Sequence, residues 1–214
     1  MKKLILPLLL LVAFGMLAAV ESNPSEVVGY VKYPCYTGNN TVAYPMGTST
    51  TAEGTVTPYV ANFGSIAMWS NAGQSWSSIT YDTEFAEWSG TLPINNAGCM
   101  TFNTSANFDF YSLGTPSAII TFAIYAGNNR IYVPLNRADL TTAEALANEM
   151  GNIGSVAWYT NSTHSWASIT YDPEFMEWSG THPISIGDPL TLNSSASTTW
   201  PTRSASGFNS TSKL

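Results

Sequence analysis

The sequence predicts a mostly β protein (α+β) with two tandem, homologous antiparallel-sheet modules, each with one short helix after the second strand. A 19-residue stretch occurs twice, as SWSSITYDTEFAEWSGTLP at 75–93 and SWASITYDPEFMEWSGTHP at 165–183. Without gaps, residues 64–93 and 154–183 are identical at 19 of 30 positions, which indicates a duplication. A period near 90 residues fits a small domain better than a solenoid repeat. Alternating apolar residues in the flanking segments indicate half-buried strands.

The duplication suggests the domain boundaries. Residues 1–20 are predicted to be a secretory signal peptide, because Lys2 and Lys3 precede an apolar run that ends in small residues. An uncleaved anchor is the alternative, although the run is short for a bilayer span of about 20 residues. We expect module 1 at 24–114, module 2 at 115–201 and a polar, disordered tail at 202–214. No membrane span is expected after signal cleavage.

Composition narrows the location and the partners. Only 10% of the residues are charged, and the formal net charge is −7. A chain without a basic stripe cannot neutralise phosphates, so nucleic acid is not an expected partner. A surface rich in Ser, Thr, Asn and Gly suits a secreted protein at the cell surface or in the extracellular space. Sequons for N-glycosylation arise from such a composition by chance, and here they include Asn39, Asn103, Asn161, Asn193 and Asn209.

The first strands are predicted at 27–36 and 41–46 in the first copy and at 117–125 and 130–135 in the second. Apolar residues recur at every second position in these segments. The Gly-Asn-Asn steps at 38–40 and 127–129 can adopt positive φ, so we expect a hairpin turn there.

A helix is predicted next. Thr141 and Glu144 have the spacing of a capping box in the second copy. In the first copy we expect a shorter helix, with Thr57 as N-cap and Pro58 in the first turn. Gly64 and Gly154 are the predicted stop signals.

Three further strands complete each copy. In the first copy they are predicted at 65–70, at 75–82 and near 99–103, with a turn at 71–74 between the first two. Their counterparts are 155–160, 165–172 and 189–193. Residues 113–116 are the predicted link between the modules.

Several short motifs together resemble a module of secreted bacterial and archaeal cell-surface proteins. They are Tyr44-Pro45-Met46, Val133-Pro134-Leu135, Thr-Thr-Ala-Glu at 141–144, Ile-Ala-Met-Trp at 66–69, Ser75-Trp76, Tyr-Asp-Pro-Glu at 171–174, Glu177-Trp178 and Thr199-Trp200-Pro201. The resemblance covers nearly all of residues 27–201. It implies a β-rich, extracellular protein and supplies no catalytic residues.

Four tryptophans are candidate ligand-binding residues, because they occupy equal positions in the two copies: Trp76, Trp88, Trp166 and Trp178. Exposed indole faces beside Asn, Asp or Gln would form a sugar-binding platform. The alternative is that these rings fill the cores of two small domains, which need large apolar side chains.

The carboxylates Asp82 and Glu84 recur as Asp172 and Glu174, which makes them candidate calcium ligands. Solvated charges at a sheet edge are the alternative. A glycosidase would need two carboxylates flanking a cleft, and no hydrolase or metalloprotease motif is present. We therefore expect no enzymatic activity and no cofactor.

The sequence has two cysteines, Cys35 and Cys99. Export to an oxidising compartment predicts a disulfide between them, and two buried free thiols are the alternative. Since we assign no other activity to the chain, the modules themselves should carry the function. We expect an extracellular structural protein, a surface-layer, matrix or filament subunit, that binds other copies of itself. Glycan binding in adhesion is the second hypothesis.

Overall fold

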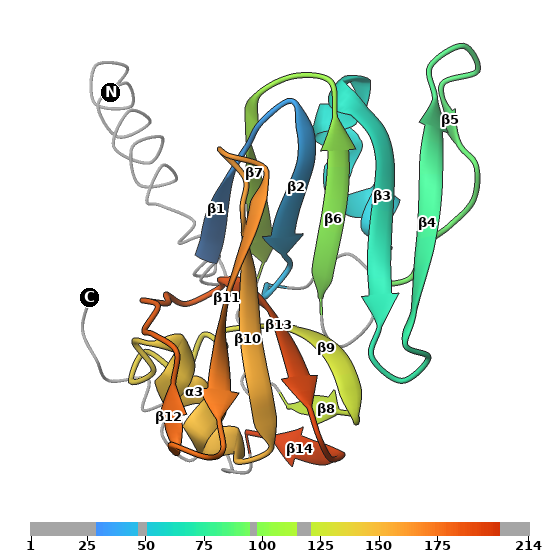
Figure 1. Cartoon of the computed structure of the whole chain (residues 1–214). Coiled ribbons are helices and arrows are strands. Elements are labelled where there is room, and N and C mark those ends of the chain that lie inside the picture. Colours follow the sequence, from blue (N-terminus) through green and yellow to red (C-terminus); the bar gives the residue numbers. More distant parts are fainter. Residues whose placement is uncertain (1–28, 47–50, 95–97, 115–120, 202–214) are drawn as a thin grey trace, which may run out of the picture.

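The computed structural model describes residues 29–46, 51–94, 98–114 and 121–201. The expected signal peptide at 1–20, the tail at 202–214 and residues 115–116 of the expected link lie outside these ranges, whereas residues 113 and 114 belong to a strand. The described chain is mostly β, and its two five-stranded antiparallel sheets are each built from strands of one copy (Figure 1). This confirms the predicted fold class.

Module 1 is the part of the described chain up to residue 114, and module 2 begins at residue 121. The elements of module 1 are β1 (Gly29–Cys35), β2 (Gly38–Ala43), α2 (Ala52–Val56), the 3-10 helix η1 (Thr57–Asn62), β3 (Phe63–Ser70), β4 (Ser75–Asp82), β5 (Glu87–Trp88), β6 (Cys99–Thr104) and β7 (Phe108–Gly114). Those of module 2 are β8 (Phe122–Ile124), β9 (Gly127–Tyr132), α3 (Ala143–Met150), β10 (Ile153–Thr160), β11 (Ser165–Asp172), β12 (Glu177–Trp178), β13 (Pro189–Ser194) and β14 (Thr198–Trp200).

The two modules share one topology. The strand order is β2-β6-β3-β4-β5 in the first large sheet and β9-β13-β10-β11-β12 in the second. The remaining strands form a ribbon in each module, β1 with β7 and β8 with β14. In module 1 this ribbon packs on the apolar face of the large sheet, where the rings of Phe102 and Phe110 meet edge to face at 5.1 Å. Each module is therefore a small two-layer β structure.

The predicted hairpin between the first two strands is wrong, because β1 and β2 belong to different sheets. Gly38 does have a φ of +107°, yet the chain turns a corner there instead of folding back on itself. The buried Asn40 holds the corner: its Oδ1 accepts from Tyr36 N at 2.7 Å, and its Nδ2 donates to Tyr36 O at 2.6 Å. Asn129 bonds to Tyr125 in the same way. The Gly-Asn-Asn step is thus the point at which the chain passes from the two-stranded ribbon to the large sheet.

Both helices start at other residues than predicted. The N-cap of α3 is Thr142, which accepts from Ala145 N. The corresponding Thr51 caps α2, which precedes Thr57 in the chain. The segment from Thr57, where a helix was expected, is the 3-10 helix η1. The expected stops Gly64 and Gly154 lie within β3 and β10 beside irregularities of register, and α3 ends at Gly151 with a φ of +83°. Helix start and stop signals were therefore misplaced by a few residues in both copies.

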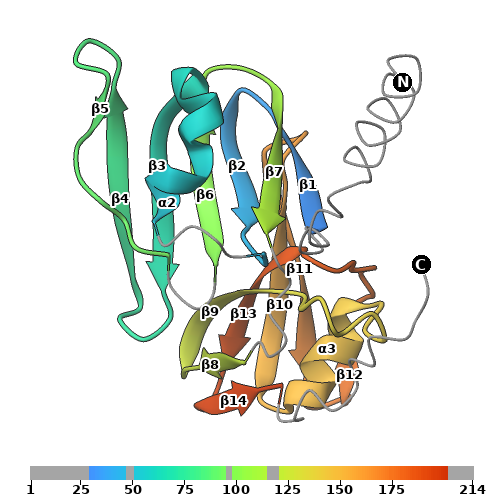
Figure 2. The same cartoon turned by 180° about the vertical axis from the view of Figure 1, so that it is seen from behind.

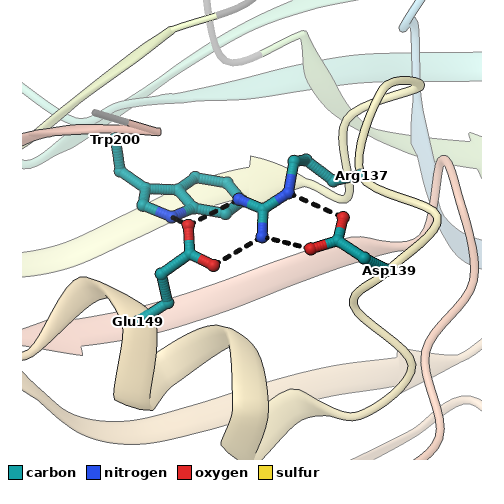
Figure 3. Close-up of polar contacts among 4 residues, drawn as sticks. All are labelled: Arg137, Asp139, Glu149 and Trp200. Carbon is teal, nitrogen blue, oxygen red and sulfur yellow. Dashed lines mark hydrogen bonds and ion pairs between the residues drawn. The ribbon is translucent and has the colours of Figure 1, made fainter. Parts of the chain in front are cut away.

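The buried apolar side chains of the two modules form one continuous cluster. In module 2 a cluster of ion pairs lies between α3 and β14 (Figure 3). Arg137 donates to Asp139 Oδ1 at 2.9 Å and pairs with Glu149, while its guanidinium lies 5.7 Å from the Trp200 ring centre. Trp200 Nε1 donates to Glu149 Oε1 at 3.2 Å. The two carboxylates raise the pKa of Arg137, so the cluster keeps its charge and ties α3 to the closing strand β14.

No helix within the described ranges combines the length and the apolar character needed to cross a membrane.

Candidate functional site: the repeated hairpins and the surfaces beside them

The repeated stretch begins with the second strand of a hairpin, β3–β4 in module 1 and β10–β11 in module 2. Figure 1 shows that the tip of each hairpin reaches the other module, β3–β4 toward β9 and β10–β11 toward β2, and Figure 2 shows the same from behind. Since β2 and β9 are the edge strands of their sheets, each hairpin tip meets an exposed row of backbone groups.

An asparagine in each tip binds the backbone of that edge strand. Asn71 Oδ1 accepts from Arg130 N at 2.8 Å, and its Nδ2 donates to Arg130 O at 3.1 Å. In the same way, Asn161 Oδ1 accepts from Thr41 N at 2.8 Å, and its Nδ2 donates to Thr41 O at 3.2 Å. The two asparagines are equivalent in the duplication, as are Thr41 and Arg130, so the interface has approximate two-fold symmetry. Asn161 is also a sequon residue, and its amide is engaged in this contact.

A second side chain in each tip extends this pairing by two residues. Gln74 Oε1 accepts from Asn128 N at 2.8 Å, and its Nε2 donates to Asn128 O at 2.7 Å. His164 Nδ1 lies 2.9 Å from Asn39 O at the equivalent place. Gln74 and His164 both have positive φ, 47° and 51°, which points their side chains at the neighbouring strand. Side-chain polar groups thus cover the edges of β2 and β9 where another strand would otherwise bind.

Arg130 lies buried at this interface. Its Nη1 donates to Thr101 Oγ1 at 2.8 Å, its Nη2 donates to Thr41 Oγ1 at 3.3 Å, and its guanidinium carbon lies 5.2 Å from the Trp76 ring centre. Within the described residues it has no carboxylate partner, and its Nε has no hydrogen-bond acceptor. Burial lowers the pKa of Arg130, against the opposing effect of Cys99. Sequence reasoning missed this residue, because a polar residue in a strand predicts a solvent-facing position.

The four candidate tryptophans separate into two pairs. Trp76 and Trp166 are 52% and 54% exposed, whereas Trp88 and Trp178 are half-buried and pack against the core. Each exposed ring lies against an aromatic neighbour across the hairpin, Trp69 at 5.5 Å for Trp76 and Tyr159 at 5.2 Å for Trp166. The sugar-platform interpretation therefore fits only Trp76 and Trp166.

The carboxylates shape a turn. Asp82 Oδ1 accepts from Glu84 N at 2.8 Å and from Phe85 N at 3.2 Å, and Asp172 does the same for Glu174 and Phe175. The described residues contain no group of three or more His, Cys, Asp or Glu that could hold a metal ion. Asp82 and Asp172 therefore have a structural role in these turns, and the calcium assignment of Asp82, Glu84, Asp172 and Glu174 stays a hypothesis.

The same turns expose aromatic side chains that the sequence did not single out. Phe85 and Phe175 are 68% and 67% exposed, and the residues that follow them, Ala86 and Met176, have a φ of +54°. Positive φ is uncommon for residues other than glycine. Its occurrence in both copies could not be inferred from residue types alone, although the duplicated Glu-Phe pair marked the place.

The expected disulfide is absent, because Cys35 and Cys99 are both buried free cysteines. Cys35 ends β1, in the ribbon, and its thiol donates to Tyr33 O at 3.7 Å. Cys99 opens β6, in the large sheet, opposite Ala43. Burial raises the pKa of each thiol to about 12, so neither is reactive at neutral pH.

Module 1 also contains an open cavity of about 400 Å³ beside η1. It is lined by Tyr44, Gly54, Thr55, Pro58, Tyr59, Tyr111 and Leu113. Tyr59 is engaged in stacking with Phe108 at 5.1 Å, so this wall belongs partly to the core.

Comparison with protein-family models, with curated proteins and with solved structures finds no match for this chain. The site therefore has to be interpreted from its own geometry.

Proposed function

We propose that this is a non-enzymatic, secreted structural protein of the cell surface or extracellular matrix, which acts by self-assembly of its tandem modules. The observation that carries the proposal is the interface between the modules. Asn71 and Asn161 bind the neighbouring sheet edge through equivalent contacts. A module of this kind is thus already an association unit within one chain.

The character of the remaining surface supports the same function. The repeated strands β4 and β11 are exposed on both faces along 75–78 and 165–168. Their residues there are Ser, Trp and Ala, without a charge. Monomeric proteins rarely leave such strands uncovered, since they promote pairing with other chains. The aspartates of the repeat accept hydrogen bonds from backbone N–H groups of their turns, a structural role that suits a non-enzymatic protein.

The test is the assembly state of the full secreted protein. Light scattering and electron microscopy over a range of concentrations should show regular assemblies that grow as the concentration rises. A protein that stays monomeric at every concentration at which it is soluble would contradict the proposal. Amino-terminal sequencing of the extracellular protein tests secretion, and we expect the mature chain to begin near residues 19–22.

Carbohydrate binding is the second candidate function, and the half-exposed Trp76 and Trp166 favour it. An indole face of this kind can stack on a sugar ring. The test is a glycan array with the variant Trp76→Ala/Trp166→Ala, and the matched control is Phe85→Ala/Phe175→Ala, which removes two exposed rings outside the platform. Signals lost in the first variant and kept in the second would support glycan binding.

A further inference from the structure

The two edges of each large sheet differ in how far they are covered by other parts of the chain. Each large sheet has two edges, and the edge formed by β2 or β9 is covered by the hairpin of the other module. On the opposite side, β5 and β12 have only two residues each. They pair with Tyr81 and Asp82 of β4 and with Tyr171 and Asp172 of β11. The first halves of β4 and β11 therefore have no neighbouring strand on that side within the described chain.

Hydrogen bonds show which backbone groups this leaves open. Thr80 O accepts from Ser89 N at 2.9 Å, and Thr80 N donates to Ser89 Oγ at 3.0 Å. The backbone of Thr80 therefore points away from β3. In an antiparallel pair of regular register the backbone direction repeats every second residue, so Trp76 and Ser78 point the same way. Their N–H and C=O groups form the open edge of β4.

The second module repeats this geometry. Ser179 N donates to Thr170 O at 2.9 Å and Ser179 Oγ accepts from Thr170 N at 3.0 Å. Trp166 and Ser168 are consequently the open edge of β11. The molecule thus carries two equal open edges, and Figures 1 and 2 place β4 and β11 on opposite sides of it.

The open edges lack the features that usually prevent pairing. Natural sheets protect an edge with Lys, Pro, a bulge or a covering segment. Residues 75–80 and 165–170 contain no charge and no proline, and both strands keep a regular register. Because the chain as a whole has a net charge of −7, an uncharged strand is a favourable place for two copies to approach.

We propose that the open edge of β4 pairs, antiparallel, with the open edge of β11 in a second copy, so that sheets continue from one molecule to the next. This inference rests on the proposed function and names the surface that assembles. The pairing of β4 with β11 sets Trp76 opposite Ser168 and Ser78 opposite Trp166, with Ser77 opposite Ala167 between them. Each indole then lies beside a small serine side chain across the seam. Two edges on opposite sides generate an open chain of molecules instead of a closed dimer.

The first experiment blocks the open edges with proline, in Ser78→Pro/Ser168→Pro. Proline removes an N–H that no strand of this chain uses and prevents pairing from outside. The control is Thr83→Pro, because module 2 already has Pro173 at this turn position. We expect the double variant to lose the assemblies that the wild-type protein and Thr83→Pro form at the same concentration. Undiminished assembly by a folded double variant would overturn edge pairing and leave the proposed function standing, whereas a monomeric wild-type protein would overturn both.

A second experiment does not depend on tolerance of proline. The variant Ser77→Cys/Ala167→Cys places thiols at exposed positions that face each other across the seam, where antiparallel neighbours have Cβ atoms about 5 Å apart. Under mild oxidation it should form a ladder of disulfide-linked oligomers. The control Phe85→Cys/Phe175→Cys carries equally exposed thiols away from the edge and should not form one. Equal crosslinking of both variants, or of neither, would overturn the proposal.

Discussion

Arg130 illustrates at the scale of one residue how the two copies have diverged. Its counterpart in module 1 is Thr41. Both residues are buried at the module interface, where Arg130 donates to the Thr41 hydroxyl. The guanidinium reaches hydroxyl groups and an indole but no carboxylate within the described chain. A buried charge without a partner costs desolvation energy, so Arg130 contributes its shape more than its charge.

Because Arg130 has no carboxylate partner among the described residues, we expect little loss of stability in Arg130→Met. Methionine retains most of the volume over Trp76 and avoids the desolvation cost, so we expect unfolding free energies within about 1 kcal/mol of wild type or higher. Arg130→Ala, which also removes the packing, should lose about 2–3 kcal/mol. Urea denaturation followed by tryptophan fluorescence measures both. If Met costs as much as Ala, the charge itself is stabilising.

His182 predicts a pH dependence of stability. Its ring stacks on Trp158 at 3.5 Å, and burial lowers its pKa below 6.5, against the attraction of Asp188 and Glu144. As the pH falls below about 6.5, the unfolded chain binds a proton that the folded chain resists, so stability should decrease. At pH 8 both states are neutral at this residue and the full contribution is present.

The matched variant is His182→Leu, because module 1 has the buried Leu92 at this position. We expect the loss of stability between pH 8 and pH 5 to be smaller in this variant than in the wild-type protein. Subtracting the two curves of melting temperature against pH isolates the effect of His182 together with its interaction with Asp188, whose pKa is raised by burial and lowered by His182. Parallel curves would show that His182 does not titrate in this range.

At the scale of elements, the repeated stretch has two separate roles. Its first strand protrudes with exposed serines and Trp76, while its end returns to the core through Trp88. Trp88 meets Phe63 edge to face at 6.3 Å and Tyr81 at 5.2 Å. In module 2 the equivalent Trp178 also donates to Asn148 Oδ1 of α3 at 2.9 Å.

These positions predict different costs of truncation. Trp88→Ala and Trp178→Ala should each destabilise the protein by about 2–4 kcal/mol, since a half-buried ring leaves a partial cavity. Trp76→Ala should cost about 1 kcal/mol or less, mainly through its contact with Arg130. Chemical denaturation monitored by circular dichroism compares the three variants. A larger cost for Trp76 than for Trp88 would contradict this assignment of roles.

At the scale of the whole molecule, the two modules resemble the halves of a symmetric dimer joined in one chain. Asn71 and Asn161 occupy equal positions on the two sides of the interface, and each makes two hydrogen bonds with backbone atoms of the residue opposite. Because the contacts use backbone groups, they tolerate the exchange of Thr41 for Arg130.

We expect Asn71→Ala and Asn161→Ala each to lower stability by about 1–2 kcal/mol, because an edge strand loses its paired acceptor and donor. Asn103→Ala is the control, since the side chain of Asn103 binds Asn39 at an exposed place within its own module. It should cost less than about 0.5 kcal/mol. Calorimetry of the three variants measures the difference, and similar costs for all three would show that the module interface adds little to stability.

Local pattern was sufficient to locate most strands, although β2 and β9 begin three residues before the predicted 41–46 and 130–135. The bounds of β4 and β11 agree with the predicted 75–82 and 165–172, and those of β6 and β13 agree with the predicted 99–103 and 189–193 within a residue. Alternation of apolar residues depends on nearest neighbours along the chain, so it reports which face is buried. The duplication, a purely sequential property, indicated that the same fold occurs twice.

Only the tertiary structure decided which strands pair and which edges remain open. Alternation does not identify a strand's partner, so the placement of β1 beside β7 and the separation of Cys35 from Cys99 could not be read locally. Nor could the burial of Arg130, which results from packing against the other module. The exposed halves of β4 and β11 are likewise a property of the whole assembly of strands. They are open because β5 and β12 are too short to cover them.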